Sequence, residues 1–279
     1  MEPEALLPIG LAALAITAVI LRRLSRSRWT PTHCEYWIYY PSGPLPKLEE
    51  VMKRLIPENP YVERGWVPIG AREGLLMSDI RLHIGLVLRA KNVSLFRPDL
   101  ELGALSPSAE QLAALARCQS LVRVRYFSPR PTEDLRHLVF LPHLAAAYSD
   151  LVGGQLIFDT VGHQLRTPSE FEGWLRNNRR LESSSEQVRV EWIEEDGGGY
   201  ARTRGMIKAG LPELQTPLSP IDHRTLIESL MNLLYRKIWT EKPTFNEEIP
   251  LQTDLDHFVA RPRVISSDRV EISLGKVSA

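Results

Sequence analysis

An uncharged apolar run occupies residues 5–21, near the start of the chain, and a cluster of arginines follows it. A helix over this run is about 25 Å long at ~1.5 Å per residue, slightly shorter than the ~30 Å hydrocarbon layer of a bilayer. Leu24 lengthens the apolar segment, and long arginine side chains reach back toward the headgroups. The pattern therefore predicts a transmembrane anchor with a basic flank in residues 1–28, in which the arginines are Arg22, Arg23, Arg26 and Arg28.

The charges around this run favour an uncleaved anchor over a secretory signal peptide. Glu2 and Glu4 precede the run and the basic residues follow it, which reverses the order found in signal peptides. A signal peptide and a soluble apolar helix remain the alternatives. Because basic flanks stay on the cytoplasmic side, we expect a single-pass protein of the cell inner membrane. Its C-terminal part is then cytoplasmic, and Trp29 lies at the membrane interface.

After the predicted anchor, two kinds of segment alternate along the chain. In one kind the apolar residues have helical spacing, and in the other every second residue is apolar. The first kind predicts helices at 46–56, 106–118, 135–151, 167–178 and 222–239. The second kind predicts strands at 34–40, 80–89, 121–127, 155–159, 188–193, 200–207 and 264–274. A polar face recurs along these strands, as is typical of antiparallel sheets. We expect an α+β fold with a mostly antiparallel sheet and packed helices, preceded by one N-terminal transmembrane helix.

Prolines, serines and glycines give the finer divisions. Pro142 is expected to kink the helix at 135–151 or to divide it into two pieces. Ser183–Ser185 reads as a linker, so the α+β region is expected to have a first part at 29–182 and a C-terminal part at 183–279. Glycines at 197–199 predict the turn of a hairpin. Asp222 is expected to cap the helix that it opens.

Composition agrees with an intracellular domain and argues against one class of partner. The 279 residues include 34 Lys+Arg and 34 Asp+Glu, so the formal net charge is +0. Nucleic-acid binding depends on a basic surface, and a balanced chain offers little of it. The chain has 2 Cys, Cys34 and Cys118, so no disulfide framework is expected. We therefore expect membrane lipid and other membrane subunits as partners, and no nucleic acid.

Three segments resemble bacterial α+β proteins of unknown function. They are GGQLIFD at Gly153–Asp159, QLRTPSEF at Gln164–Phe171, and TRGMIKAGLPEL at Thr203–Leu214. In those proteins a short strand ending in Asp, a Thr-Pro-x-Glu-Phe helix start and a Gly-Leu-Pro-Glu-Leu turn occur together. The resemblance implies a shared fold and carries no activity, and this chain departs from it in having the N-terminal apolar run.

Most catalytic motifs are absent from the sequence. It has no Gly-x-Ser-x-Gly, His-Glu-x-x-His, Gly-x-x-x-x-Gly-Lys or Cys-x-x-Cys motif. Asp159 and His163 are the remaining candidates for an acid/base pair across a tight turn. An aspartate at the end of a strand more often accepts backbone N–H bonds in an Asx-turn, and this is the favoured interpretation.

Two other groups of polar residues are weaker candidates for a functional site. Cys34 is adjacent to His33, but neighbouring residues on a strand point to opposite faces, so a buried thiol is favoured. Arg202, Arg204 and Lys208 alternate along one predicted strand face and could meet an anion, although a solvated face is the simpler interpretation.

Metal and cofactor binding are not expected. Asp254, Asp256 and His257 offer metal-ligand types but lack partners at a defined spacing. We therefore expect no metal site and no cofactor in this chain.

Small residues within the apolar run suggest where a partner helix could pack. Gly10, Ala13 and Thr17 lie at positions i, i+3 and i+7, on one side of a helix. The sequence thus predicts a membrane-anchored accessory or interaction protein, a subunit of a larger membrane complex. The alternative is a membrane-bound, hydrolase-like enzyme acting through Asp159 and His163.

Overall fold

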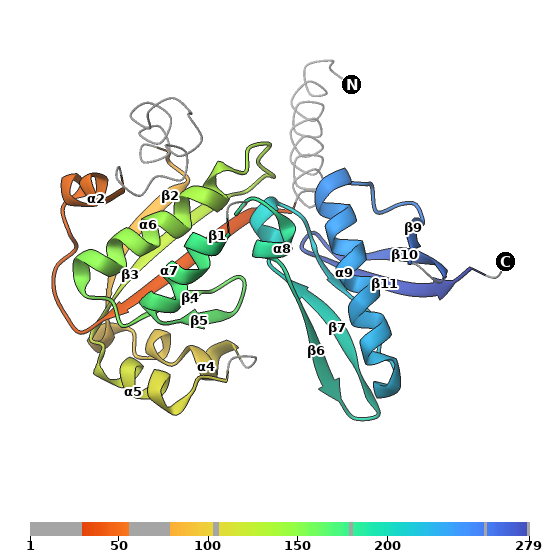
Figure 1. The fold of residues 1–279 in the computed structure, drawn as a ribbon, viewed down its shortest axis with the longest axis horizontal. Helices are drawn as coiled ribbons and strands as arrows, with labels where there is room; N and C mark the ends of the chain where they lie inside the picture. Colours follow the sequence, from red (N-terminus) through yellow and green to blue (C-terminus); the bar gives the residue numbers. More distant parts are fainter. Residues whose placement is uncertain (1–29, 56–78, 103–105, 179–180, 254–255, 278–279) are drawn as a thin grey trace, which may run out of the picture.

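The computed structural model describes residues 30–55, 79–102, 106–178, 181–253 and 256–277, and two sheets organise them (Figure 1). The first sheet has the strand order β2-β3-β1-β4-β5, and all of its pairs are antiparallel. The second has the order β6-β7-β8-β11-β10-β9, and only the β8–β11 pair is parallel. The expected α+β class with mostly antiparallel sheets is confirmed for this part of the chain.

The first sheet is built from β1 (Thr32–Tyr40), β2 (Leu82–Leu88), β3 (Ser120–Ser128), β4 (Leu156–Asp159) and β5 (Gln164–Arg166). Its helices are α2 (Leu48–Leu55), α4 (Pro98–Leu102), α5 (Ala109–Arg117), α6 (Arg136–Val152) and α7 (Pro168–Asn177), with 3-10 turns η3 (Arg89–Lys91) and η4 (Ser94–Phe96). The succession β1-α2-β2-β3-α6-β4 with this strand order is the split βαβ arrangement.

The alternation along β1 assigns a face of the sheet to each set of helices. Cys34, Tyr36 and Ile38 join a core with α2, α6 and α7. Trp37 and Tyr39 point to the other face and pack with η4 and α5. Because successive strand residues point to opposite faces, one aromatic-rich strand can supply both cores.

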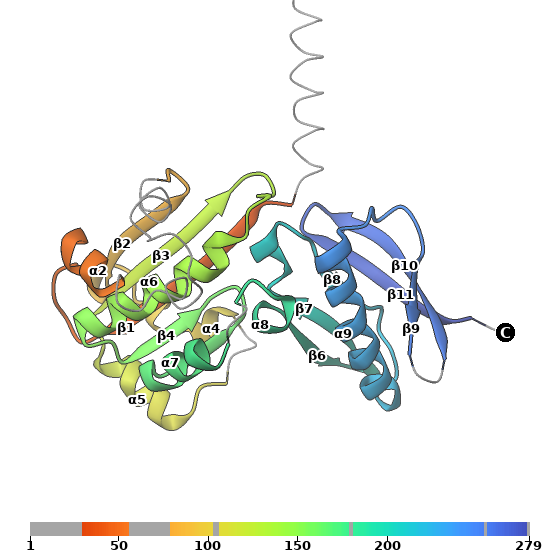
Figure 2. The same cartoon turned by 45° about the horizontal axis from the view of Figure 1, so that its top comes forward.

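The second sheet contains β6 (Arg189–Glu195), β7 (Gly198–Arg204), β8 (Glu213–Gln215), β9 (Ile249–Gln252), β10 (His257–Ser266) and β11 (Arg269–Lys276). Its helix α9 (Arg224–Glu241) covers one face, and the short α8 (Ser184–Gln187), η5 (Met206–Ala209) and η6 (Ile221–His223) lie in the connections. The apolar side of α9 packs on this sheet in a core of its own (Figure 2). Leu138 of α6 joins this core, so the two halves touch.

The structure contradicts two details of the helix predictions: the division at Pro142 and the capping role of Asp222. Pro142 does not divide α6, which is one helix from Arg136 to Val152. A proline inside a helix costs roughly 3 kcal/mol, whereas each fully buried large apolar side chain contributes about 1.5–3 kcal/mol. Several such side chains of α6 are buried, so packing outweighs the lost hydrogen bond. Asp222 lies in η6 and does not cap α9, whose N-cap is His223, without a side-chain cap bond.

Two segments contain more structure than expected. The serine segment expected as a linker continues into α8. The expected last strand at 264–274 is a hairpin of β10 and β11, preceded by β9. Pro262 and the Ser266–Arg269 turn interrupt the alternation there, so the pattern concealed the hairpin.

No helix in the described ranges is long and apolar enough to cross a membrane. The predicted anchor, its flank through Arg28, and Trp29 lie outside the described residues. The seam of Gly10, Ala13 and Thr17 lies there as well. The division of the α+β region into parts at 29–182 and 183–279 stays a prediction.

Candidate functional site

A buried ion pair joins the two halves of the protein. Asp159 ends β4 of the first sheet, and Lys208 lies in η5 of the second half. The Lys208 Nζ donates to Asp159 Oδ2 at 2.5 Å, and the side chains are 1% and 6% exposed. Lys208 Nζ also donates to Gln187 Oε1 at 3.0 Å. Buried charges are tolerated when they are paired and hydrogen-bonded, and this pair meets both conditions.

The backbone around Lys208 explains why its side chain points inward. Gly205 and Gly210 flank η5 with φ values of 115° and 70°, in the left-handed region that favours glycine. The Gly205 N–H donates to Glu213 Oε1 at 2.8 Å, and Thr203 Oγ1 donates to Glu213 Oε2 at 2.7 Å. The glycines and the buried glutamate of the TRGMIKAGLPEL segment thus form the turn that holds Lys208.

The second carboxylate oxygen of Asp159 is occupied by backbone groups. Asp159 Oδ1 accepts hydrogen bonds from the N–H groups of Val161 at 3.2 Å and Gly162 at 2.9 Å. A Cβ on residue 162 would lie 2.6 Å from Asp159 Oδ2, so this turn requires glycine. These bonds are those of the expected Asx-turn. Both oxygens of Asp159 therefore serve the fold.

The groups beside the ion pair are buried and hold their protons. Burial raises the pKa of Cys34 to about 12, and it also raises the pKa of Tyr36. The Tyr36 ring lies with its centroid 5.9 Å from Lys208 Nζ and meets the edge of Phe171 at 5.8 Å. A thiol with such a high pKa is a poor nucleophile, as expected for a buried Cys34. Cys118 is buried as well, with its pKa raised to about 11.

His163 follows Asp159 in the chain, but these two described residues share no hydrogen bond. Burial, with a contribution from Arg204, lowers the pKa of His163 to about 4. Its backbone φ is 50°, and its buried Nδ1 has no hydrogen-bond partner. His163 is therefore neutral near pH 7 and a weak base, and the acid/base role of the pair stays a prediction.

Arg202 and Arg204 lie on the predicted strand, but Lys208 does not share it. Arg202 and Arg204 lie on β7, and Arg204 Nε donates to Glu191 Oε2 at 3.1 Å. Burial and the neighbouring Arg204 lower the pKa of Arg202, and its buried Nε has no partner. Lys208 lies beyond the end of β7, in η5, so the strand alternation did not extend to it.

A second buried carboxylate, Glu35, was not foreseen from the sequence. Its Oε1 accepts from Trp37 Nε1 and from Arg123 Nε, both at 2.5 Å. Its Oε2 accepts from Arg123 at 3.1 Å and is 3.0 Å from His33 Nε2. Burial alone would raise the pKa of Glu35, but hydrogen bonds from His33, Arg123 and Trp37 lower it to about 2. The sequence signal that could have indicated a buried carboxylate was the position of this acidic residue within an aromatic-rich strand.

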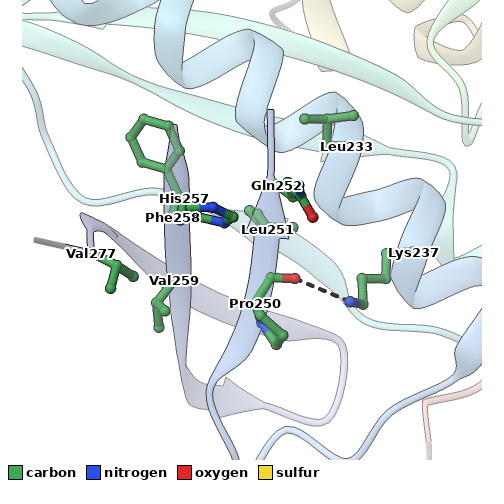
Figure 3. A pocket seen from close by; sticks show the side chains of 9 residues that line it. All are labelled: Leu233, Lys237, Pro250, Leu251, Gln252, His257, Phe258, Val259 and Val277. Carbon is green, nitrogen blue, oxygen red and sulfur yellow. Dashed lines mark hydrogen bonds between the residues drawn. The ribbon is translucent and has the colours of Figure 1, made fainter. Parts of the chain in front are cut away.

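A groove of about 530 Å³ lies between α9 and the strands β9 and β10 (Figure 3). Its titratable lining residues are Lys237 and His257, and Lys237 Nζ donates to the Pro250 carbonyl at 3.1 Å. The rest of the lining is mostly apolar. The groove therefore has no nucleophile and base side by side.

The metal-like cluster does not assemble within the described part of the chain. Asp254 lies outside that part, and Asp256 Oδ1 pairs with Lys276 Nζ at 2.6 Å. Among the described residues no group of His, Cys, Asp and Glu could hold a metal ion.

Comparison with known proteins gives no relative. No protein-family model, no curated protein and no solved structure matches this chain. The architecture itself therefore defines the class: an α+β protein with two mostly antiparallel sheets joined by a buried ion pair.

Proposed function

We propose that this protein is a single-pass, membrane-anchored accessory subunit whose α+β part faces the cytoplasm. The observation that carries the proposal is the apolar run at 5–21 with the arginines directly behind it. The membrane is the cell inner membrane, and the partners are its lipid and other membrane protein subunits, with no nucleic acid. Gly10, Ala13 and Thr17 would form the face for a partner helix.

The interior of the α+β part supports a binding role over a catalytic one. The buried charged groups Asp159, Lys208 and Glu35 are each engaged by partners from other elements. Such groups stabilise one arrangement of the fold, whereas catalytic groups are usually poised in a cleft with substrate access. The groove beside α9 is lined mostly by apolar groups.

Membrane extraction of the full chain tests the anchor. The chain should stay in the membrane pellet after an alkaline carbonate wash. An Ala13→Arg variant is the matched control, since arginine near the centre of a span costs about 2.5–3.5 kcal/mol on insertion scales. Release of the unaltered chain by carbonate would contradict the proposal. Purification in mild detergent should then recover a defined membrane protein partner, and isolation of the chain alone would count against the subunit role.

One observation favours the alternative, a membrane-bound hydrolase-like enzyme. His163 combines a left-handed backbone, a depressed pKa and a nearby half-buried Arg202, and strained residues with shifted pKa values cluster at active sites. His163→Asn keeps the fold because asparagine tolerates this backbone conformation. The full chain and this variant should both lack turnover in a hydrolase substrate screen. Turnover that the variant loses, with an unchanged melting temperature, would establish the enzyme instead.

A further inference from the structure

Exposed apolar side chains gather at the end of the molecule where the described chain begins. Thr30 is buried at the start of β1, and its Oγ1 donates to the Ser267 carbonyl at 2.5 Å. Ser267 lies in the turn between β10 and β11, so this turn is fixed beside the entry of the chain (Figure 2). Val264 and Ile265, just before the turn, are 57% and 50% exposed.

The exposure of these two side chains has a structural cause. The register of β10 against β11 shifts between Val264 and Ser266, which leaves Ile265 as the extra residue of a β-bulge. The core of this hairpin contains Phe258 and Ala260 of β10 and Val270 and Ile272 of β11. It reaches β11 beside the turn but leaves Val264 and Ile265 of β10 exposed. Packing within the described part of the protein therefore does not cover Val264 and Ile265.

A further apolar residue lies on the other side of the entry point. Ile80 is 88% exposed and precedes β2 at the same end of the first sheet, where the Phe127 N–H donates to the Arg81 carbonyl at 3.0 Å. Two strand spacings of about 4.8 Å separate β2 from β1. Val264, Ile265 and Ile80 thus flank the entry point, and we call them the apical apolar residues.

The charges of the described residues at this end balance, because Arg81 and Arg136 are paired and Glu133 and Asp268 offset Arg130 and Arg269. Arg81 pairs with Asp79 at 2.6 Å, and Arg136 pairs with Asp134. An acidic or basic protein partner would find little net charge to recognise here. Apolar contact is the interaction that this end offers.

We infer that the apical apolar residues lie in the headgroup layer of the membrane and orient the α+β part on it, an inference that rests on the proposed anchor. Thr30 is six positions after Leu24, the last apolar residue of the predicted span, and a chain of that length extends about 20 Å at most. The headgroup layer occupies about 5–8 Å of that distance. The hairpin next to Thr30 is therefore held within reach of the bilayer, where Val and Ile side chains bury apolar area.

Lipid-attached quenchers test this orientation in the full chain reconstituted into vesicles. Single cysteines are placed by Ile265→Cys, Val264→Cys and Ile80→Cys and labelled with an environment-sensitive fluorophore. Cys34 and Cys118 are buried, so the unaltered chain should incorporate no label. Asp196→Cys, in the exposed β6–β7 turn, is the matched control and lies at the far end of its sheet (Figure 1).

We expect nitroxide-bearing phospholipids to quench the apical labels severalfold more than the control label. Quenching should be similar in vesicles of phosphatidylcholine alone and in vesicles containing phosphatidylglycerol, because the contact is apolar. Equal quenching at all positions, in a chain that resists carbonate extraction, would overturn this inference and leave the anchor intact. If the apical labels became less quenched as the protein-to-lipid ratio rises, a second copy of the chain would cover this surface. That result would also overturn the inference. Release by carbonate would show that the anchor itself fails.

Discussion

Lys208 and Asp159 form a 2.5 Å ion pair that is almost fully buried and connects the second half of the chain to the central part of the first sheet. The residues are 49 positions apart in the sequence. Their segments are GGQLIFD at Gly153–Asp159 and TRGMIKAGLPEL at Thr203–Leu214. The structure gives those segments a common role, because one supplies the carboxylate and the other the glycine-bounded turn that carries the amine.

We expect the contributions of Asp159 and Lys208 to the free energy of unfolding to depend strongly on each other. Asp159→Asn and Lys208→Met should each lower the free energy of unfolding by about 3–5 kcal/mol, because each leaves a buried charge without its partner. The double variant should lose clearly less than the sum of the two. Denaturant unfolding of the four proteins measures this coupling.

An exposed pair provides the control for that cycle. Arg176 and Glu172 lie one turn apart on α7, with side chains 78% and 42% exposed. Arg176→Met should change the free energy of unfolding by less than about 1 kcal/mol. Additive losses in the Asp159 and Lys208 variants would show that the buried pair does not couple the two halves.

Glu35 should make the protein sensitive to acid. Hydrogen bonds lower the pKa of Glu35 from its ordinary value of 4.5 to about 2 in the folded protein, so its contribution is fully present above about pH 4.5. The contribution is lost as the pH falls from 4.5 toward 2, because the unfolded state then binds the proton first. At ~1.4 kcal/mol per pKa unit the upper limit is about 3 kcal/mol.

Glu35→Gln tests this contribution. The variant should be less stable at pH 7, and its stability should fall less steeply than that of the unaltered protein between pH 4.5 and 2. Glu172→Gln, at an exposed position, should leave both quantities nearly unchanged. Parallel pH profiles for the Glu35 variant and the unaltered protein would contradict the assignment.

His163 should titrate near pH 4 instead of near 6.5. Burial and Arg204 disfavour its charged form, so the unfolded state takes up a proton first as the pH falls through this window. Stability should therefore rise with pH between about 4 and 6.5, and His163→Asn should reduce that rise. NMR of the imidazole C–H signals measures the midpoint directly, and a midpoint near 6.5 would show an exposed ring.

Gly10→Leu tests the predicted seam for a partner helix. Leucine adds bulk where two backbones would approach, so the complex should become smaller on a native detergent gel, while membrane insertion persists. Ala15→Leu, on the opposite side of the predicted helix, is a control that should leave the complex unchanged. An unchanged complex in Gly10→Leu would limit Gly10 to lipid contact.

Local sequence signals predicted most of the long elements because their causes are local. Thr167 and Glu170 form the expected capping box of α7, with both hydrogen bonds present. Ser108 and Gln111 do the same for α5. Alternation of apolar residues placed β1, β2 and β3 within a few residues of their observed ends.

Contacts between distant segments were beyond the reach of such signals. The sequence placed Lys208 on a strand face because its spacing from Arg204 fits an alternating pattern, and the left-handed turn at Gly205 moved it into the interior. The sequence did not single out Glu35, because its partner Arg123 lies on β3, 88 positions away in the chain. Short strands such as β8 and β9 contain too few residues to show a period.

We propose that the apolar run at 5–21 anchors the chain in the membrane and leaves the α+β part in the cytoplasm. The most direct measurement fuses to the C-terminus of the full chain a reporter enzyme that is active only outside the cytoplasm, and assays it in carbonate-washed membranes. We predict a membrane-retained fusion with no reporter activity, and strong activity when the arginines at 22, 23, 26 and 28 are moved ahead of the apolar run. Strong reporter activity from the unaltered chain would contradict the cytoplasmic orientation, and its release by carbonate would contradict the anchor.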